Sequence, residues 1–507
     1  MEEGKKKSSV PFLRQCFVTA GVCLNILGHG AVVGFTAFLI PGLRKPESHI
    51  KTTVTDESSI ASIVGIALIV GNFTMTPLMG SIGRKKSHIL TIFPILIGWF
   101  TIILADSVTT LVVARFLQGI SMGMHAPLGA VIVAEMTHPA NRGAFLSCIS
   151  LSLATGIFIC HTVGTYLTWQ QSALAMSFIP FCSLIGIIFS PESPAWLISK
   201  GRYDEAAEVF YWLRGHSEEE DAELERMITV QNMVKKSSVA GQKLSLNTRI
   251  KRGLKYLSES FRKPEFYKPV SIMFFMYIVY QFSGINVITS YALDIIKQVV
   301  GPEANAKLLM VAMDVARIIC NICAVFVMRK LKRRTVLFCS GMVVVMAYFA
   351  KGVFVYAKQS GSLPTVMQGQ WLPILILAVY VSMTVGLTTV PFAISGEIFP
   401  LEYRGLAGGI SALPWSINFF VAVKCFPILT VNIGMPLTYL LYGCVLLISL
   451  VFLYFLLPET KDKTLQEIED KFRGLTVVDK RASEPLEREK EENSELLRRT
   501  SSTIIVL

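Results

Sequence analysis

Residues 280–291 read Tyr-Gln-Phe-Ser-Gly-Ile-Asn-Val-Ile-Thr-Ser-Tyr and lie inside a long apolar segment, about residues 269–296. A segment of about 20 residues or more crosses a bilayer as a helix, and lipid offers its polar side chains no hydrogen-bond partners. The amides of Gln281 and Asn286 and the hydroxyl of Tyr291 must therefore face a neighbouring helix or a cavity. Uncharged groups of this kind suit a neutral polyol, and they suit hydrogen bonds between helices equally well.

Composition extends this interpretation to the whole chain. Of the 507 residues, 52% are apolar and only 17% are charged, which is too apolar for a soluble protein of this size. About twelve apolar runs are long enough to span a membrane. They lie near residues 16–40, 59–80, 87–105, 110–135, 144–168, 172–190, 269–296, 307–328, 335–357, 371–396, 407–430 and 436–457.

The basic residues between these runs predict the orientation of the helices. They gather before the first run and in every second loop, whereas the opposite loops are nearly bare or balanced by acids. The positive-inside rule therefore places both termini and the long segment 191–268 in the cytoplasm. The net charge of +12 indicates orientation rather than nucleic-acid binding. The basic residues are Lys5, Lys6, Lys7, Arg14, Arg84, Lys85, Lys86, Arg142, Arg329, Lys330, Lys332, Arg333, Arg334 and Arg404.

The chain repeats one set of motifs. Each half carries a basic cluster after its second run, a glutamate and an arginine after its fourth, and a Pro-Glu pair after its sixth. Two six-helix halves with matching motifs are typical of a transporter whose site lies between parallel repeats. The repeated residues are Arg84, Glu135, Arg142 and Glu192 in the first half, and Arg333, Glu397, Arg404 and Glu459 in the second.

We therefore predict an all-α membrane protein with twelve transmembrane helices in two six-helix halves. Its parts are a cytoplasmic N-terminus (1–15), a first half (16–190), a cytoplasmic loop with short helices (191–268), a second half (269–457) and a cytoplasmic tail (458–507). We interpret the repeated glutamates and arginines as a latch, in which residues such as Glu135 and Arg404 pair across the halves when the inner side is closed. Orientation and charge pairing at helix ends are the alternative interpretation.

Taken together and in order, the motifs make the chain resemble the sugar porters of the major facilitator superfamily, and most closely the insect facilitated trehalose transporters. The resemblance covers roughly residues 15–475. It rests on Gly83-Arg84-Lys85, Arg115-Phe-Leu-Gln118-Gly119, Glu135 with Arg142-Gly143, Pro-Glu-Ser-Pro at 191–194 with Trp196, Trp212-Leu-Arg214-Gly215, Gln281-Phe-Ser-Gly-Ile-Asn286, Glu397 with Arg404-Gly405, Trp415 with Asn418, and Pro458-Glu-Thr-Lys461.

The resemblance implies a set of site residues. Gln281, Asn286, Tyr291, Trp415 and Asn418 match positions that line the sugar cavity in that family. Pro391 matches a proline in a broken tenth helix that gates the cavity.

Other cavity positions depart from the family pattern. Tyr280 and His161 stand where the family usually has glutamines, and Arg317 stands where it usually has an asparagine. An arginine near the middle of a span is costly unless it has a partner, and Asp314 lies three residues earlier on the same helix face. We expect these two residues to pair, which keeps the site nearly neutral. An unpaired Arg317 would instead favour an anionic solute.

Energy coupling is also predicted from the sequence. The chain contains no phosphate-binding loop of the Gly-x4-Gly-Lys-Ser/Thr type. Proton symport in the resembled family is associated with an aspartate where Thr36 stands, so we expect facilitated diffusion. His29 is the ionisable group left in the first run, and we expect a packed residue there.

Three functional classes remain open at this point: a facilitative carrier of a sugar such as trehalose or a hexose, a sugar sensor that no longer transports, and a carrier of a charged or non-sugar solute. An enzyme is not expected, because no nucleophile–base group stands out. Cys320 and Cys323 have metal-like spacing without a second pair or nearby histidine, so we expect no metal and no cofactor.

We expect a monomer in the plasma membrane. Its tail is expected to be disordered after residue 474, with an acidic dileucine pattern ending at Leu497 and a kinase pattern at 498–501 as possible contacts for a sorting adaptor or a kinase.

Overall fold

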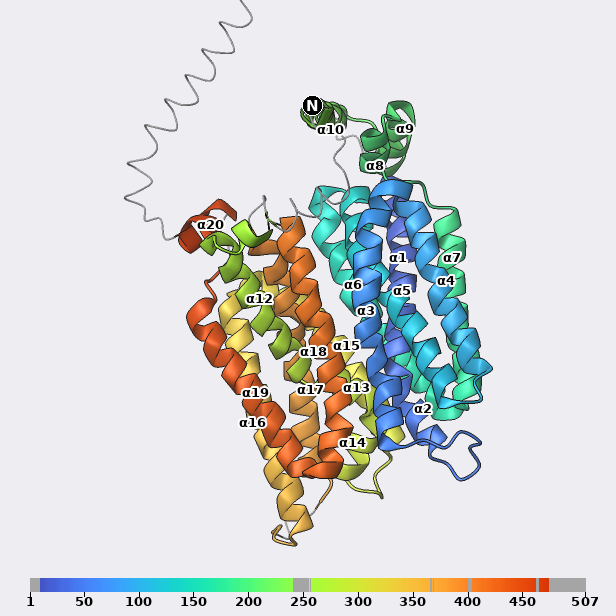
Figure 1. Ribbon diagram of the computed structural model, residues 1–507, viewed down its shortest axis with the longest axis vertical. Helices are drawn as coiled ribbons and strands as arrows, with labels where there is room; N and C mark the ends of the chain where they lie inside the picture. The colour runs from blue at the N-terminus through green and yellow to red at the C-terminus, as the bar shows by residue number, and fades with distance from the viewer. Residues whose placement is uncertain are drawn as a thin grey trace, which may run out of the picture.

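The computed structural model describes residues 10–239, 255, 257–364, 367, 369–399, 404–461 and 465–473. Twelve helical segments in these ranges are long and apolar enough to cross a membrane. They form two bundles of six that lie side by side (Figure 1). The predicted fold class, an all-α membrane protein with two six-helix halves, is confirmed.

The first half contains α1 (Val10–Gly34) with its continuation α2 (Thr36–Leu43), α3 (Val54–Ile82), α4 (Arg84–Ile103), α5 (Val108–Met136), α6 (Pro139–Tyr166) and α7 (Trp169–Ile188). The second half contains α12 (Pro264–Phe282) with α13 (Ile285–Ser290), α15 (Ala306–Lys330), α16 (Arg333–Gln359), α17 (Trp371–Glu397), α18 (Arg404–Asn432) and α19 (Met435–Leu456). The halves meet where α3 packs on α18 and α6 packs on α15.

Short helices mark the two ends of the molecule. α8 (Pro194–Lys200), α9 (Tyr203–Arg214), α10 (Glu218–Val239) and α20 (Leu465–Arg473) lie at one end, called here the α8–α20 end. α2 and α14 (Ala292–Val299) lie at the other, called the α2–α14 end (Figure 1). The short helices expected within 191–268 are present as α8, α9 and α10. Residues 240–254 of this loop lie outside the described residues, as do the sorting and kinase patterns of the tail.

Local sequence explains where several spans begin. Thr53 accepts a hydrogen bond from the backbone N–H of Asp56, whose side chain accepts one from the backbone N–H of Thr53, so the pair forms a capping box on α3. Thr168 and Gln171 form the same box on α7. Each box satisfies backbone N–H groups that a helix start would otherwise leave without partners.

The seventh span is interrupted at Ser283 and Gly284. Gly284 has φ +80°, and a Cβ built there would lie 2.0 Å from the hydroxyl oxygen of Tyr348, so only glycine fits. The phenol of Tyr380 donates a hydrogen bond to the Ser283 carbonyl oxygen, which the break frees. The single helix expected over 269–296 is therefore wrong, because α12, α13 and α14 divide this segment.

The break implied for the tenth span at Pro391 is absent. α17 runs without interruption from Trp371 to Glu397 with Pro391 inside it. Proline is tolerated within a transmembrane helix when neighbouring groups satisfy the carbonyl that it frees.

Glycines let helices touch through their backbones. In the first half, a Cβ on Gly156 of α6 would lie 2.0 Å from the Leu27 carbonyl oxygen of α1. Between the halves, a Cβ on Gly65 of α3 would lie 2.7 Å from the backbone nitrogen of Phe420 on α18. Close approach of this kind is how helices pack in lipid, where apolar side chains gain little by leaving the solvent.

This packing gives a stability prediction. We expect Gly156→Ala to lower the free energy of unfolding by about 1–3 kcal/mol, because the added methyl group forces α1 and α6 apart. Gly143→Ala in the same helix is the matched control, since a Cβ there has no heavy atom within 4 Å. Thermal unfolding of the purified protein measures both, and equal melting temperatures for the two variants would contradict the prediction.

Candidate solute site and charge networks

The structure brings three of the predicted site residues together beside the break in the seventh span. The Asn286 side-chain amide donates to the Gln281 side-chain oxygen (2.7 Å), and the Gln281 amide donates to the Trp415 carbonyl oxygen (3.2 Å). Gln281 is fully buried, and the buried Trp415 Nε1 has no hydrogen-bond partner in the described structure. The group therefore links α12, α13 and α18 and leaves one indole N–H free to donate.

Other predicted site residues donate hydrogen bonds to nearby backbone carbonyl oxygens. The Tyr291 hydroxyl donates to Val423 (3.1 Å), the Asn418 amide donates to Pro414 (2.8 Å), and the Thr36 hydroxyl donates to Val33 (3.3 Å). Tyr280 is buried with its ring edge-on to Phe392. The Tyr291 bond joins the seventh span to α18, whereas the Asn418 and Thr36 bonds stay within one turn of their own chain segment, and in the described structure no hydrogen bond joins these four residues to Gln281 or Asn286.

A buried charged cluster joins the two halves. His161 of α6 places Nδ1 2.5 Å from the Asp314 Oδ2 of α15, and its Nε2 lies 3.1 Å from the Gly34 carbonyl oxygen. Arg317 Nη1 lies 3.3 Å from the other carboxylate oxygen of Asp314. All three side chains are almost completely buried. The predicted Asp314–Arg317 pair is therefore present, but His161 shares its carboxylate.

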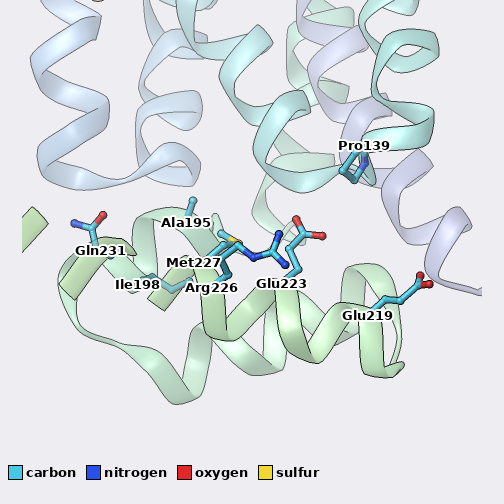
Figure 2. Close-up of a pocket in the computed structure, with 8 residues that line it drawn as sticks. All are labelled: Pro139, Ala195, Ile198, Glu219, Glu223, Arg226, Met227 and Gln231. Carbon is cyan, nitrogen blue, oxygen red and sulfur yellow. The ribbon is translucent and has the colours of Figure 1, made fainter. Parts of the chain in front are cut away.

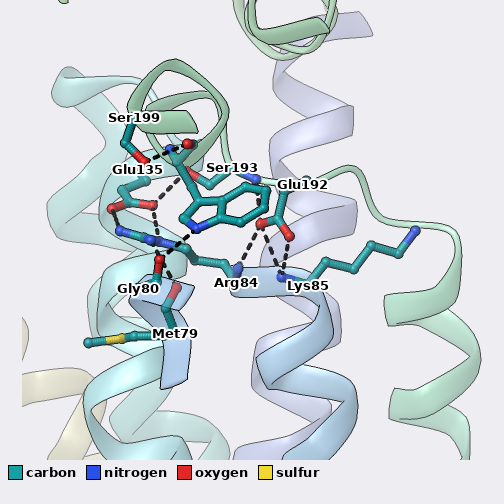
Figure 3. A network of polar contacts seen from close by, with 9 residues as sticks. Met79, Gly80, Arg84, Lys85, Glu135, Glu192, Ser193 and Ser199 are labelled. Atoms are coloured by element: carbon teal, nitrogen blue, oxygen red, sulfur yellow. Dashed lines mark hydrogen bonds and ion pairs between the residues drawn. The ribbon is translucent and has the colours of Figure 1, made fainter. Parts of the chain in front are cut away.

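A second network holds the α8–α20 end of the first half (Figure 3). The Arg84 guanidinium binds both carboxylate oxygens of Glu135 (2.8 and 2.7 Å), and the Ser193 hydroxyl donates to Glu135 (2.6 Å). The Glu192 carboxylate accepts the backbone N–H groups of Arg84 and Lys85 at the start of α4. Bidentate and charge-assisted bonds of this kind are the stronger hydrogen bonds in proteins.

The second half repeats this network residue for residue. Arg333 binds Glu397 (3.0 Å), Thr460 donates to Glu397 (2.6 Å), and Glu459 accepts the backbone N–H groups of Arg333 and Arg334. Burial alone would raise the pKa of Glu459, but four backbone N–H bonds outweigh it and hold the pKa below its usual value. The repeated sequence motifs thus form the same contacts twice.

These networks lie within each half, so the predicted pairing across the halves is not formed in this state by Glu135 or Glu397. The Nε of Arg142 is buried and has no hydrogen-bond partner in the described structure. The side chain of Arg404 lies outside the described residues.

Polar contacts join the halves at the α2–α14 end. Arg44 binds Glu57 of its own half and Asp294 of the other (2.5 and 2.8 Å). The Lys424 ammonium donates to the Ser59 hydroxyl (2.6 Å), and Lys307 donates to the Thr165 carbonyl oxygen (2.7 Å). No local sequence signal predicts the three contacts between the halves, since each joins residues more than 100 positions apart.

Two further buried clusters were not predicted. His29 and His88 each lie against His125 in the first half with their rings tilted, at centroid distances of 5.3 and 4.9 Å, and His29 Nε2 also lies 3.0 Å from the Ser121 hydroxyl. In the second half, Lys351 lies over the rings of Tyr380 and two other tyrosines, 3.4 Å from the Tyr380 centroid. Cation–π contacts of this kind replace the water that a buried ammonium loses.

A pocket of about 560 Å³ lies outside the spans, where α6, α8 and α10 meet (Figure 2). Glu219, Glu223 and Arg226 line it together with apolar residues. It belongs to the α8–α20 end and contains none of the predicted solute-binding residues.

Comparison with known sequences decides the family. The family model for sugar (and other) transporters matches residues 16–472, nearly the whole chain. The chain belongs to the sugar transporter family. The predicted resemblance is therefore confirmed, and this member of the family is a transporter rather than an enzyme.

Individual relatives agree with this assignment. A facilitated trehalose transporter, Tret1, of Apis mellifera ligustica is 29% identical over 477 residues, covering 92% of this chain and 90% of the relative. Tret1 of Culex quinquefasciatus is 30% identical over 471 residues, covering 92% and 87%. The inward open conformation of the xylose transporter XylE from E. coli superposes with a TM-score of 0.71 at 18% identity, covering 90% of this chain and 99% of that one. This last likeness shows the fold alone.

The amide pair gives the next prediction. If Gln281 and Asn286 bind the solute, Gln281→Leu and Asn286→Leu should each weaken transport about tenfold to a hundredfold, the effect of losing about 1–3 kcal/mol from a buried polar contact. Gln298→Leu is the control, because Gln298 is exposed on α14. Uptake per molecule at the cell surface is the measurement, and unchanged uptake in both test variants would assign the amides to helix packing.

Proposed function

We propose that this member of the sugar transporter family carries a neutral sugar across the plasma membrane by facilitated diffusion, with alternating access between its two halves. The observation that carries the proposal is the uncharged group of Gln281, Asn286 and Trp415 beside the broken seventh span. Amides and an indole N–H recognise hydroxyl groups without needing charge on the solute.

The pairing of Asp314 with Arg317 supports a neutral solute. The carboxylate lies within ion-pair distance of the guanidinium (3.3 Å), so the fixed charge of the arginine has a counter-charge on its own helix. An arginine compensated in this way does not require an anionic group from the solute.

Two observations support uniport. Thr36 stands at the position where proton-coupled sugar porters have an acid, and its hydroxyl donates to the Val33 carbonyl oxygen. The relatives from Apis and Culex are named facilitated trehalose transporters, and this supports trehalose or a hexose as the solute.

The charge of the loops supports cytoplasmic termini, so that the α8–α20 end faces the cytoplasm. We further propose that the protein works as a monomer in the plasma membrane. The tail patterns near residues 492–501 support contacts with a sorting adaptor or kinase.

A transport assay tests the proposal. Cells expressing the chain should take up labelled trehalose or a hexose with saturation. Net uptake should stop when the sugar concentration is equal on the two sides of the membrane. Organic anions, offered in parallel, should not compete. Binding of sugar without saturable flux would show a sensor, and uptake of anions alone would show a carrier of charged solutes.

The latch also remains a proposal, and it predicts a kinetic defect. We expect Glu135→Gln to slow sugar exchange about tenfold while binding persists, because Glu135 loses its charge partner Arg84 and cannot pair across the halves. Glu205→Gln is the control, since its bond to Arg202 is exposed. Exchange rate and binding affinity are measured on the same preparation. Loss of binding in step with exchange would instead indicate misfolding or a role at the solute site.

A further inference from the structure

Two phenols of the second half lie against the break in the seventh span. The Tyr380 hydroxyl of α17 donates to the Ser283 carbonyl oxygen, which can only accept a hydrogen bond. A phenol carries one hydrogen, so the hydroxyl of Tyr348 on α16, 3.2 Å away, is the donor to Tyr380. A Cβ at Gly284 would lie 2.0 and 2.3 Å from these two oxygens. The break is therefore held by a chain of two hydrogen bonds that begins on α16.

A lysine contacts the rings of both phenols. Lys351 lies one turn after Tyr348 on α16, and its ammonium nitrogen is 4.1 Å from the Tyr348 ring centroid and 3.4 Å from that of Tyr380. The ring of Tyr439 on α19 lies at 4.8 Å. All four side chains are almost completely buried, and Lys351 forms no ion pair within the described ranges. The negative ring faces replace the water that the ammonium has lost, and the ammonium in turn fixes the rings.

The same side of α16 holds the other end of the broken segment. Lys358 follows Lys351 by seven residues, which is about two turns of the helix. Its ammonium donates to the carbonyl oxygen of Val300, the residue after α14 (3.1 Å). α16 thus contacts the segment at the break before α13 and again at the end of α14.

We propose that Lys351, Tyr348 and Tyr380 are positioning residues for the solute site. They hold the break in the geometry that places Asn286 on Gln281. The inference rests on the proposed function, in which these two amides bind the solute. Gln281 lies two residues before the break and Asn286 two residues after it, so their 2.7 Å hydrogen bond spans the break. A change in the phenols therefore acts on the amide pair through the backbone.

Tyr439 provides a control within the same group of rings. Its ring also faces Lys351, yet its buried hydroxyl has no hydrogen-bond partner in the described structure. Tyr380→Phe and Tyr439→Phe remove the same atom from two buried rings, and both variants keep the ring faces around the ammonium. Only Tyr380→Phe leaves the Ser283 carbonyl oxygen without its donor, and a buried acceptor without a donor is costly.

Hydrogen–deuterium exchange of the full-length protein in lipid nanodiscs, resolved by peptide mass spectrometry, tests the inference. We expect Tyr380→Phe to speed exchange of the α13 amides about tenfold to a hundredfold, because the unpaired carbonyl favours local opening of this segment. Tyr439→Phe should change the same rates less than about threefold. In both variants, peptides from α16 and α19 should exchange as in the unchanged protein.

Lys351→Met tests the lysine itself. Methionine is an unbranched apolar side chain that fills the space but offers the rings no cation. We expect the α13 amides to exchange at least about tenfold faster in this variant, again with α19 unchanged. Sugar affinity, measured on the same preparations, should fall in Lys351→Met and in Tyr380→Phe but not in Tyr439→Phe.

Unchanged α13 exchange in Tyr380→Phe would overturn the inference, as would an equal acceleration in Tyr439→Phe. Faster exchange throughout α16 and α19 would also overturn it, because the rings would then support only the stability of the bundle. Unchanged exchange in Lys351→Met would overturn the part assigned to the lysine, and faster exchange with unchanged sugar affinity would overturn the link to the solute site. The exchange readout needs no solute, so absence of sugar binding in every protein would refute the proposed function and leave the exchange result unaffected.

Discussion

A polar group inside a bilayer must find its partner within the protein, because lipid supplies none. This constraint accounts for most of the interior described above. Gln281 and Asn286 satisfy each other and a carbonyl oxygen of α18. The carbonyl freed at the Ser283 break receives the phenol of Tyr380, and the ammonium of Lys351 lies among aromatic rings. Each solution binds one helix to another, so the polar residues that could transport a solute are also those that hold the bundle together.

The charge networks at the α8–α20 end show that the two repeated halves form the same ion pairs and hydrogen bonds. Arg84 with Glu135 and Arg333 with Glu397 occupy equivalent places in the two halves, and each is completed by a hydroxyl from the segment after the last span of its half. A glutamate in that segment, Glu459 in the second half, caps the start of a helix through backbone N–H groups. Each half is therefore braced by its own ion network.

The sequence was most informative for features that depend on residues close together in the chain. Span length and repeated motifs were sufficient for the fold, and the spacing of Asp314 and Arg317 on one helix face was sufficient for their pairing. The contact of His161 with Asp314 joins residues that are 153 positions apart, and no periodicity or spacing reports such a contact. The position of the helix break was misjudged for a related reason. Pro391 breaks a helix only if its surroundings leave the freed carbonyl unsatisfied, whereas Gly284 is required by two tyrosines from distant helices.

The contact of Gly65 with Phe420 has a mechanical consequence. α3 and α18 belong to different halves, and at this point only a hydrogen atom separates their backbones. Interlocked side chains would have to separate before one helix could rotate against the other, whereas the glycine at this contact carries no side chain to interlock. The contact can therefore serve as a pivot for rotation of one half against the other. A larger side chain at residue 65 would hinder that rotation, even where it left the solute site and both ion networks unchanged.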